Sequence, residues 1–301
     1  MNYRITNQTS SNDLISRINS QRSRLNTLQE QITSGKRINR PSDDPGGSEV
    51  VLRLRASQTE ITQFQRNAQA ASQKLTSTDN SLSGYQAALD RARTLVTQGL
   101  GDTASQDAKN ALATELDSLR SRMLTIANTK NDDGYVFGGT RQTAPPYDPA
   151  TAAPAATPTS PQFIQVEPGA NAIAVGVTAD TVFGDATSTV FADLTNAVAA
   201  LRGTGDPVAD RATLQNANAR LGVYSGLANN ATAVIGANMN STDTAIETLT
   251  TSFQSLDQRA SDLEQINFAE TAVKLTDSQN ALDASLQVAA KGQRSLFDFL
   301  G

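Results

Sequence analysis

The densest group of residues that could bind an ion lies at positions 34–47, which read SGKRINRPSDDPGG. Glycines beside a lysine can form a loop that holds a phosphate, and clustered oxygen atoms can hold a calcium ion. Here the adjacent carboxylates of Asp43 and Asp44 would repel a phosphate, and no ring of further oxygen ligands is spaced for calcium. The pattern favours a structural role, in which one helix stops, a loop follows and a second helix starts.

The local chemistry of this segment agrees with the structural interpretation. Gly35 is a normal helix stop, and Arg40 is pushed toward extended geometry by the proline that follows it. Asp44 suits a helix N-cap with Pro45 at the first helical position, and its carboxylate would lie at the positive end of the helix dipole. We therefore expect an inter-domain loop that contains Gly35, Arg40, Pro41, Asp43, Asp44 and Pro45.

Other residue types that carry chemistry are absent or scattered. The chain has no histidine and no cysteine, which removes thiol nucleophiles, disulfides and thiolate or imidazole metal sites. Residues 131–134 (NDDG) resemble a fragment of a calcium loop, but no glutamate follows at the required distance, so a turn is expected. None of the 30 acidic residues falls in a predicted apolar cleft. We expect no catalytic residue, no cofactor and no metal site.

The composition indicates long helices rather than a globule. Only 38% of the 301 residues are hydrophobic and 5% are aromatic, with no tryptophan, so bulky core residues are scarce. The net charge of −5 is spread along the chain, and no basic stripe for nucleic acid is present. No stretch is apolar enough to span a membrane, and the first residues lack the pattern of a cleaved signal peptide.

Four segments carry apolar residues at alternating steps of three and four, which is the seam of a helix packed lengthwise on another helix. The first spans residues 14–32, and the second spans residues 50–96, from Val50 through Leu54 and Ser57 onward. The third spans residues 112–126, after a break at residues 99–102. The fourth spans residues 214–263, and its spacing slips near Thr242 in a way that unwinds a supercoil.

A last helix is expected after residue 267. Residues 267–270 (NFAE) read as a capping box, and the helix that follows has its own apolar seam between residues 272 and 300. Between the outgoing and returning helices, residues 140–187 are rich in proline and poor in charge. Residues 163–166 and 172–177 predict short strands, and Asp133 with Gly134 predicts a hairpin turn.

The predicted fold is therefore mainly α, with a small β insert, in a long antiparallel helical bundle formed by both chain ends. Residues 1–40 and 267–301 should form a terminal coiled-coil domain that is disordered in the monomer. Residues 41–139 and 188–266 should form a helical rod, and residues 140–187 a β-rich outer domain. The inner seams are expected to be ordinary bundle core.

The outermost helices call for a different interpretation, because two narrow-seamed helices at the tips of a hairpin bury too little surface to be firmly ordered alone. We expect them to pack against other subunits. The predicted assembly interface consists of Leu14, Ile18, Leu25, Leu28, Ile32, Leu275, Leu282, Leu286, Leu296, Phe297 and Leu300.

Three stretches resemble the bacterial flagellin-related axial proteins. Residues 31–45 (QITSGKRINRPSDDP) are similar to the family's N-terminal signature, residues 134–139 (GYVFGG) to its entry into the outer domain, and residues 295–300 (SLFDFL) to a closing motif. In flagellins themselves, the first stretch usually continues with a sequence similar to AKDDAAG, and the chain more often ends in a sequence similar to LLR. The resemblance therefore favours the members that form the hook–filament junction. It covers about residues 1–140 and 200–301, and Gly46 and Gly47 depart from the alanines that are common there.

The resemblance implies a mechanical adaptor between a curved, flexible hook and a stiffer filament. It implies a homo-oligomeric ring in the flagellar axis, with hook-associated protein 1 on one side and flagellin on the other. It also implies export through the flagellar type III apparatus and a cytoplasmic chaperone that guards the C-terminal helix. No nucleic-acid or membrane partner is expected.

The residues leave two alternative functions to consider. One is a minor flagellin that polymerises along the filament, which the closing sequence at residues 296–300 disfavours. The other is a secreted enzyme or metal-binding factor with its activity in the β insert. That insert is short and poor in charged or nucleophile-supporting residues, so this alternative is weak.

Overall fold

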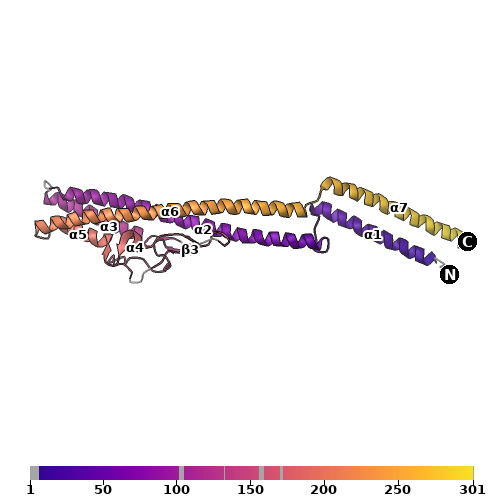
Figure 1. Cartoon of the computed structure of the whole chain (residues 1–301), viewed down its shortest axis with the longest axis horizontal. Helices are drawn as coiled ribbons and strands as arrows, with labels where there is room; N and C mark the ends of the chain where they lie inside the picture. The colour runs from indigo at the N-terminus through magenta and orange to yellow at the C-terminus, as the bar shows by residue number, and fades with distance from the viewer. Residues whose placement is uncertain (1–6, 102–104, 132, 156–158, 170–171, 301) are drawn as a thin grey trace. The chain divides into compact units, whose positions relative to one another are not determined.

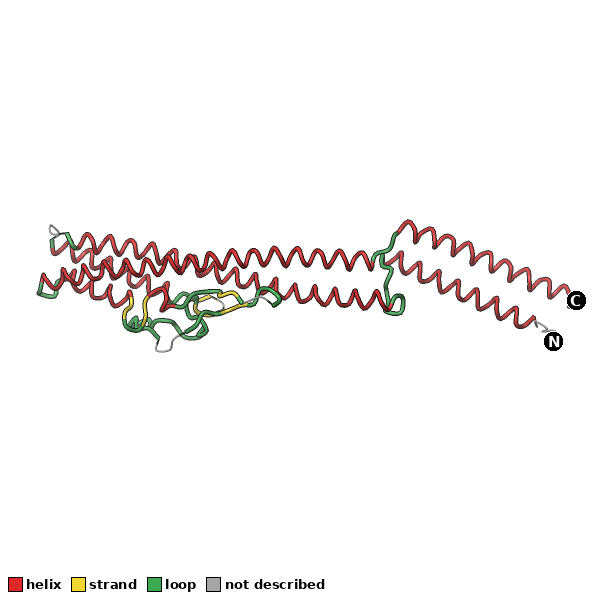
Figure 2. Tube along the Cα trace, viewed as in Figure 1, coloured by secondary structure: helices red, strands yellow, loops and turns green. Residues whose placement is uncertain are grey.

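The computed structural model describes residues 7–101, 105–131, 133–155, 159–169 and 172–300, and side chains between residues 12 and 291. Most of this chain is helical (Figures 1 and 2). The helices are α1 (Asn7–Ser34), α2 (Pro45–Gly99), α3 (Gln106–Ala127), α4 (Ala179–Phe183), α5 (Val190–Arg202), α6 (Pro207–Glu264) and α7 (Phe268–Leu300). The prediction of a mainly α fold with a small β part is confirmed. Within the described residues, no helix is long and apolar enough to cross a membrane.

Among the described residues, the strands form three short antiparallel pairs. They are β1 (Lys130–Asn131) with β2 (Gly134–Tyr135), β3 (Phe163–Ile164) with β4 (Ile173–Ala174), and β5 (Gly184–Asp185) with β6 (Ser188–Thr189). The first hairpin lies at the predicted turn, and β3 and β4 fall within the two predicted strand segments, whose pairing the sequence did not predict. The third hairpin and the short helix α4 were not predicted. Helix α5 lies within the predicted helical rod, but it was not identified as a separate helix, although its buried residues Val190, Leu194, Ala197 and Leu201 recur at helical spacing. Thr189 starts α5 by accepting a 3.2 Å hydrogen bond from the amide of Ala192.

The chain divides into two compact units. The first unit contains Met1–Glu60 and Ser252–Gly301, and the second contains Ile61–Thr251. Helices α2 and α6 each contribute to both units. The units are described separately below.

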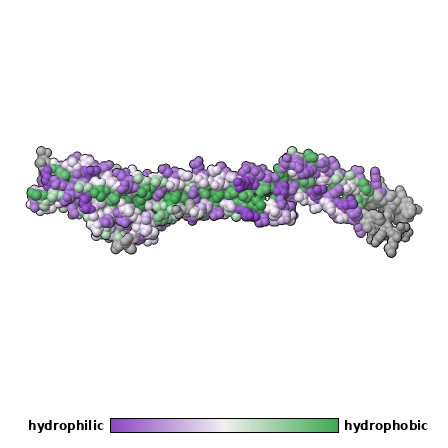
Figure 3. Space-filling view, viewed as in Figure 1, coloured by the Kyte–Doolittle hydropathy of each residue, from purple (hydrophilic) through white to green (hydrophobic). Residues whose placement is uncertain are grey.

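The second unit has a well-buried core between α2, α3, α5 and α6. Leucine, alanine, tyrosine and methionine side chains at heptad spacing are fully buried, as expected for bundle core. They include Leu75, Leu82, Leu89, Leu116, Met123, Leu194, Leu221 and Ile235. Figure 3 shows apolar residues in a band along the middle of this unit, where α6 runs in Figure 1.

The β-rich insert shares this core. The ring of Phe183 lies 4.4 Å from that of Tyr85 on α2 and 5.0 Å from that of Phe137. Tyr147 packs against Phe191 of α5 at 4.8 Å, and its hydroxyl donates a 2.9 Å hydrogen bond to the carbonyl of Gly184. Such tilted aromatic contacts stabilise a core beyond the area they bury. Helix α2 and the insert are thereby joined through large buried rings.

The start of α2 departs from the predicted seam. Val50 is 41% exposed, whereas Val51 and Gln58 are buried. Ser57, which the predicted seam placed inside, is exposed. Gln58 takes the inner position because its amide donates to Asp257 at 3.1 Å and its carbonyl accepts from Arg55 at 2.9 Å. A polar residue here fits the core through its hydrogen bonds, which an apolar pattern does not reveal.

Candidate assembly surfaces

Helices α1 and α7 run side by side in the first unit, with both chain ends at the same end of the pair (Figure 1). Seven of the predicted interface residues lie along this pair and are only half-buried there: Leu14, Ile18, Leu25, Leu28, Ile32, Leu275 and Leu282. Leu286 is 39% exposed. The side chains of Leu296, Phe297 and Leu300 lie outside the described part of the structure. The α1–α7 pair thus leaves much of its apolar surface uncovered.

Polar residues occupy central positions of the same seam. Thr271 and Ser278 of α7 are buried, one step of the helix repeat before Leu275 and Leu282. On α1, Gln21 stands between Ile18 and Leu25, and its Oε1 atom is buried without a hydrogen-bond partner. A buried acceptor without a partner destabilises the pair. The seam of the first unit is therefore weaker than a core made of leucine alone.

Further apolar side chains of α7 face away from α1. Phe268, Val273 and Val288 are each about 60% exposed, at 62%, 60% and 62%. On α1, Ile15 is 56% exposed beside the partly buried Leu14. Single exposed apolar residues are common, but here they follow one helix for much of its length. The pair has apolar surface to offer on more than one side.

The loop at residues 35–44 packs against the turn between α6 and α7. We call residues 35–44 together with residues 263–267 the joint. The amide of Arg37 donates to the carbonyl of Glu264 at 2.5 Å, and the amide of Ile266 donates to the carbonyl of Gly35 at 3.2 Å. Lys36 and Gln265 form an antiparallel bridge. Backbone hydrogen bonds of this kind fix the two connectors to each other independently of side-chain identity.

Two arginines strengthen the joint. The guanidinium of Arg37 donates to the carboxylate of Asp44 and to the carbonyl of Leu263, both at 3.1 Å. The guanidinium of Arg55 reaches Glu264 at 2.9 Å and Asp257 at 3.2 Å. Lys36 adds a 3.5 Å ion pair to Glu264, whose side chain is only 12% exposed. Glu264 is thus the acceptor through which α2 and the loop both hold the end of α6.

The predicted loop residues are brought together as one structure. Gly35 ends α1 with a φ of 70°, a conformation that glycine adopts without strain. Asp43 closes a turn: its amide donates to the carbonyl of Arg40 at 2.9 Å, and its carboxylate accepts from the amide of Arg40 at 2.8 Å. Pro41 is the second residue of this turn, where its fixed φ is favourable. Arg40 pairs with Glu30 of α1 at 3.1 Å.

Asp44 and Pro45 start α2 as the sequence predicts. The carboxylate of Asp44 accepts a 2.9 Å hydrogen bond from the amide of Gly47. A Cβ atom on Gly47 would lie 2.5 Å from an oxygen of Asp44 and 2.8 Å from the terminal carbon of Ile38. A Cβ atom at residue 47 would therefore require the capping carboxylate of Asp44 and the side chain of Ile38 to shift. The glycine that departs from the family's alanines therefore fits the close approach of the cap to the loop.

These contacts shift the pKa values of charged side chains in the first unit. The amide of Gly47, followed by the guanidinium of Arg37, holds the pKa of the Asp44 carboxyl below its usual value. The hydrogen bond to Glu264 raises the pKa of the Arg55 guanidinium. On α7, Lys274 lowers the pKa of Glu270. Each shift favours the charged form that makes the hydrogen bond.

The start of α7 is only half of the predicted capping box. The side chain of Asn267 accepts a 3.3 Å hydrogen bond from the amide of Glu270, as a cap should. Glu270 does not complete the box, since its carboxylate accepts a 2.6 Å bond from Lys274 one turn later.

Sequence reasoning missed Arg37, Arg55, Asp257 and Glu264. The two acidic residues lie more than 200 positions after the arginines they bind. No local pattern marks them, because charged residues at helix ends are ordinary. Only the antiparallel layout of the helices brings these charges together.

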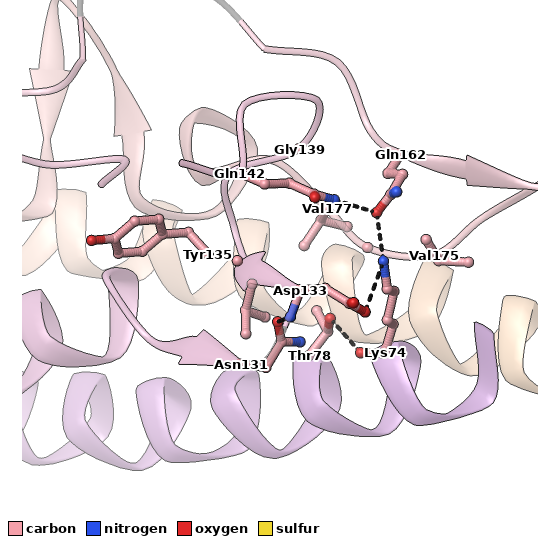
Figure 4. A pocket seen from close by; sticks show the side chains of 13 residues that line it. Lys74, Thr78, Asn131, Asp133, Tyr135, Gly139, Gln142, Gln162, Val175 and Val177 are labelled. Atoms are coloured by element: carbon pink, nitrogen blue, oxygen red, sulfur yellow. Dashed lines mark hydrogen bonds and ion pairs between the residues drawn. The ribbon is translucent and has the colours of Figure 1, made fainter. Parts of the chain in front are cut away.

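The second candidate ion-binding segment of the sequence, at residues 131–134, lies between β1 and β2. Residues 131–134 form the predicted hairpin turn between β1 and β2, although Asp132 lies outside the described residues. Within the described residues, no group of three or more histidine, cysteine or acidic side chains is placed to hold a metal ion. Near this turn, Lys74 donates to Gln162 at 3.0 Å and pairs with Asp133 at 3.2 Å (Figure 4). Lys74 thereby ties α2 to the hairpin and to the insert.

A hollow of about 220 Å³ in the insert is lined by proline, alanine and glycine together with Phe137, Tyr147, Arg141, Asp180 and Asp185. The carboxylate of Asp185 accepts hydrogen bonds from Thr187 and Ser188, which close the turn of the third hairpin. The buried Tyr147 hydroxyl donates to Gly184. These groups hold the insert together, and they are not arranged as a nucleophile with a neighbouring base.

Comparison with known proteins agrees with this architecture. Residues 5–141 match the family described as the bacterial flagellin N-terminal helical region. The chain is 32% identical over 125 residues to the flagellar hook-associated protein 3 of Salmonella typhimurium, which covers 41% of this chain and 39% of that protein. It is 28% identical over 278 residues to the flagellar hook-associated protein 3 of Escherichia coli, which covers 85% of this chain and 86% of that protein.

A solved structure has the same fold. The putative flagellar hook-associated protein of Vibrio parahaemolyticus superposes with a TM-score of 0.68 at 18% identity, over 74% of this chain and all of that one. At this level of identity the match supports the mainly α fold with its β insert.

Proposed function

We propose that this chain, which belongs to the flagellin-like family of bacterial axial proteins, is a structural subunit of the junction between flagellar hook and filament. The single observation that carries the proposal is the α1–α7 seam, where seven predicted interface residues stay half-buried and Gln21 has a buried atom without a partner. Such a pair gains stability when neighbouring subunits cover it. The alignment with a hook-associated protein along most of both chains supports the same role.

The geometry suits a mechanical subunit rather than an enzyme. A well-packed second unit resists deformation, because its side chains fill the interior at high density. In the α1–α7 pair, by contrast, the half-buried apolar side chains are available for contacts with neighbouring subunits. The joint holds α1 and α7 to the ends of α2 and α6 through Arg37, Arg55 and Glu264. Force that acts on the terminal helices would pass through these bonds.

The partners follow from this role. Copies of the chain would form a ring in the flagellar axis, with hook-associated protein 1 on the hook side and flagellin on the filament side. The predicted interface residues from Leu14 to Ile32 on α1, and from Leu275 to Leu300 on α7, would contribute the apolar contacts between subunits. The inter-domain loop at residues 35–45 would hold α1 against the start of α2 and the end of α6 within the first unit.

Before assembly, α7 needs protection. Exposed Val273, Val288 and Leu286 would make a free helix prone to nonspecific association. We therefore propose that a cytoplasmic chaperone covers this helix and that the chain leaves the cell through the flagellar type III apparatus. Coprecipitation of a chaperone by the full chain, lost on truncation after residue 267, would support this step. Equal capture by the truncated chain would contradict it.

Localisation tests the junction role directly. Isolated hook–basal-body preparations, with and without filament, should both carry the protein at the distal end of the hook, where gold-labelled antibody detects it. A chain lacking residues 296–300 should stay folded in its second unit yet fail to retain filament. Labelling along the filament, or normal motility of the truncated variant, would contradict the proposal.

The alternative of a minor flagellin predicts a different behaviour. A flagellin should form long filaments alone at high concentration, because head-to-tail contacts that do not close build open helical filaments. The chain proposed here should remain short or monomeric under the same conditions. Electron microscopy of the concentrated protein separates the two, and long filaments would favour the alternative.

A further inference from the structure

Two faces of the α1–α7 pair carry similar groups with opposite charge. Ile15 and Arg22 are exposed on α1, and each directly follows a residue of the seam. Val288 and Asp277 are exposed on α7, and each directly precedes a residue of the seam. The first two residues are two helical turns apart and the last two are three turns apart, so each set lies on one face of its helix. Each face therefore offers one branched apolar side chain and one charge.

The two faces lie on opposite sides of the pair. Helices α1 and α7 run in opposite directions, because α1 ends at the joint and α7 begins there. In an antiparallel pair, residues that follow a seam residue lie on one side on both helices, and residues that precede one lie on the other side. We call the side with Ile15 and Arg22 the Arg22 side, and the side with Val288 and Asp277 the Asp277 side. A single copy of the chain cannot bring these two sides together.

The groups on the two sides lie at similar heights along the pair. The carbonyl of Gly35 accepts a backbone hydrogen bond from the turn before α7, which sets the register of the two helices. At about 1.5 Å per residue, Ile15 lies about 30 Å from this bond and Val288 about 33 Å. Arg22 lies about 20 Å from it and Asp277 about 17 Å. When two copies stand side by side at one level, apolar therefore meets apolar and arginine meets aspartate.

The charges on these faces are not used within one copy. Among the described side chains, Arg22 and Asp277 form no hydrogen bond or ion pair, although an arginine of α1 pairs within its helix at 3.1 Å and a lysine of α7 at 2.6 Å. On α1 the unpaired charges of this part of the chain are both basic, Arg22 and Arg24. On α7 those before Lys291 are both acidic, Asp277 and Asp283. The two helices thus offer complementary charges to a neighbour.

The apolar residues on both sides are uncovered as well. Ile15 is 56% exposed and Val288 is 62% exposed. Leu286, which is 39% exposed, directly follows the seam residue Ser285 and so lies on the Arg22 side. It stands about 30 Å from the joint, at the height of Ile15. The Arg22 side therefore has two apolar side chains, one from each helix, at the level where a neighbouring copy would present its valine.

We propose that the Arg22 side of one copy packs against the Asp277 side of the next copy. Arg22 then pairs with Asp277, and Val288 of the second copy is covered by Ile15 and Leu286 of the first. The proposal rests on the axial-subunit function above and names a contact within it. Because the two sides differ, the contact runs head to tail, which builds a ring or an open helix rather than a closed pair. The ion pair selects the neighbour and its level more than it adds affinity.

Pairs of single-cysteine chains test the contact, since the natural chain has no cysteine. One chain would carry Ile15→Cys and the other Val288→Cys, so that only a contact between copies can link them. Ser16→Cys is the matched control, because it stands at the same height on α1 but is exposed opposite the seam. Flagella from cells that produce both chains would be treated with a short bismaleimide and analysed by immunoblot.

We expect about ten times more covalent dimer from Ile15→Cys with Val288→Cys than from Ser16→Cys with Val288→Cys. Equal yields in the two mixtures, or a product with a different flagellar protein in place of the dimer, would overturn the proposal. If the same immunoblot finds no natural chain in flagella, the axial function itself fails. If the chain is present and gives no dimer, only this contact fails.

Charge reversal tests the ion pair itself. Arg22→Glu and Asp277→Lys should each lower the amount of chain retained in flagella several-fold, because like charges then face each other in every contact. The variant with both changes should recover at least half of the natural amount. Arg24→Glu makes the same change on α1 but precedes the seam residue Leu25, so it lies on the other side and should not rescue Asp277→Lys.

The free chain separates an effect on assembly from an effect on folding. Because neither charge has a partner among the described side chains of one copy, circular dichroism and urea unfolding of the free chain should be the same for the natural chain and for all these variants. With every variant folded, single reversals that are retained like the natural chain would contradict the proposal. A double variant that is retained no better than the single ones would contradict it too.

Discussion

The two units of this molecule solve the packing of long helices in opposite ways. In the second unit, Leu75, Leu82, Tyr85 and Leu89 of α2 are completely buried. In the first unit, the corresponding steps of α1 are leucines and isoleucines that stay half-exposed, with Gln21 among them. Similar heptad patterns therefore lead to a finished core in one place and an unfinished seam in the other. What differs is the number of neighbours that the chain itself supplies.

Removing a core ring should have the largest effect. Phe183→Ala deletes a side chain that contacts Tyr85, Phe137 and Tyr147, and should destabilise the second unit by about 3–5 kcal/mol. Urea unfolding followed by circular dichroism measures the loss. Phe163→Ala is the matched control, because that ring is 58% exposed, and should change stability by less than about 0.5 kcal/mol. If Phe183→Ala lowered the stability no more than Phe163→Ala does, the ring of Phe183 would not be part of the core that joins the insert to α2.

The unfinished seam should tolerate substitution better. Leu25→Ala removes a half-buried side chain, so the expected loss is about 1 kcal/mol, against about 2–5 kcal/mol for a buried leucine such as Leu89. Hydrogen exchange should speed up in α1 and α7 and stay unchanged in α3 and α5. A loss at Leu25 as large as that at Leu89 would erase the distinction between the units.

The joint should be sensitive to one arginine and not to its neighbour. Arg37→Ala removes the hydrogen bonds to Asp44 and to the carbonyl of Leu263, and should weaken the joint by about 1 kcal/mol. Arg53→Ala removes only an exposed pair with Glu49 on the same helix, so amide exchange at residues 35–44 should not change. Equal exchange in the two variants would show that the backbone bonds hold the joint alone.

Acid should loosen the joint by the smallest amount. The pKa of Asp44 is lowered in the folded chain, so its contribution is complete above the unfolded value of about 3.9 and is lost as the pH falls through the lower folded value. Glu270 follows the same sign. After correction for the intrinsic pH dependence of amide exchange, the protection factor of the Gly47 amide should therefore fall below about pH 4, and Asp44→Asn should remove most of this dependence. An unchanged pH profile in Asp44→Asn would assign the effect to other groups.

Much of the architecture could be predicted from the sequence, because local signals and the global fold agree. Gly35 as a stop, Asp44 with Pro45 as a start, and the glycines near residue 100 all lie where the helices change. The apolar repeat also identifies the buried face of α2 beyond Ile61. These features depend on residues close together in the chain.

The features that escaped prediction depend on distant partners. Gln58 rather than Ser57 faces inward because its side-chain amide donates a hydrogen bond to Asp257. Arg55 binds Glu264, the last residue of a helix about 200 positions later in the chain. Phe183 of α4 packs against the ring of Tyr85, and Phe191 of α5 packs against the ring of Tyr147. Both partners lie outside residues 179–202, so the local sequence does not reveal these contacts. On α7, Thr271 and Ser278 lie inside the seam although their types suggest a surface.

The most direct test of the account is hydrogen exchange of the full chain, free and assembled in purified flagella. In the free protein, amides of α1 and α7 should exchange much faster than those of α2 between residues 75 and 96. In the assembled protein, the amides of α1 and α7 should become protected, while those of residues 75–96 stay as they were. Equal protection of α1 and α7 in both states would contradict the claim that other subunits complete this seam.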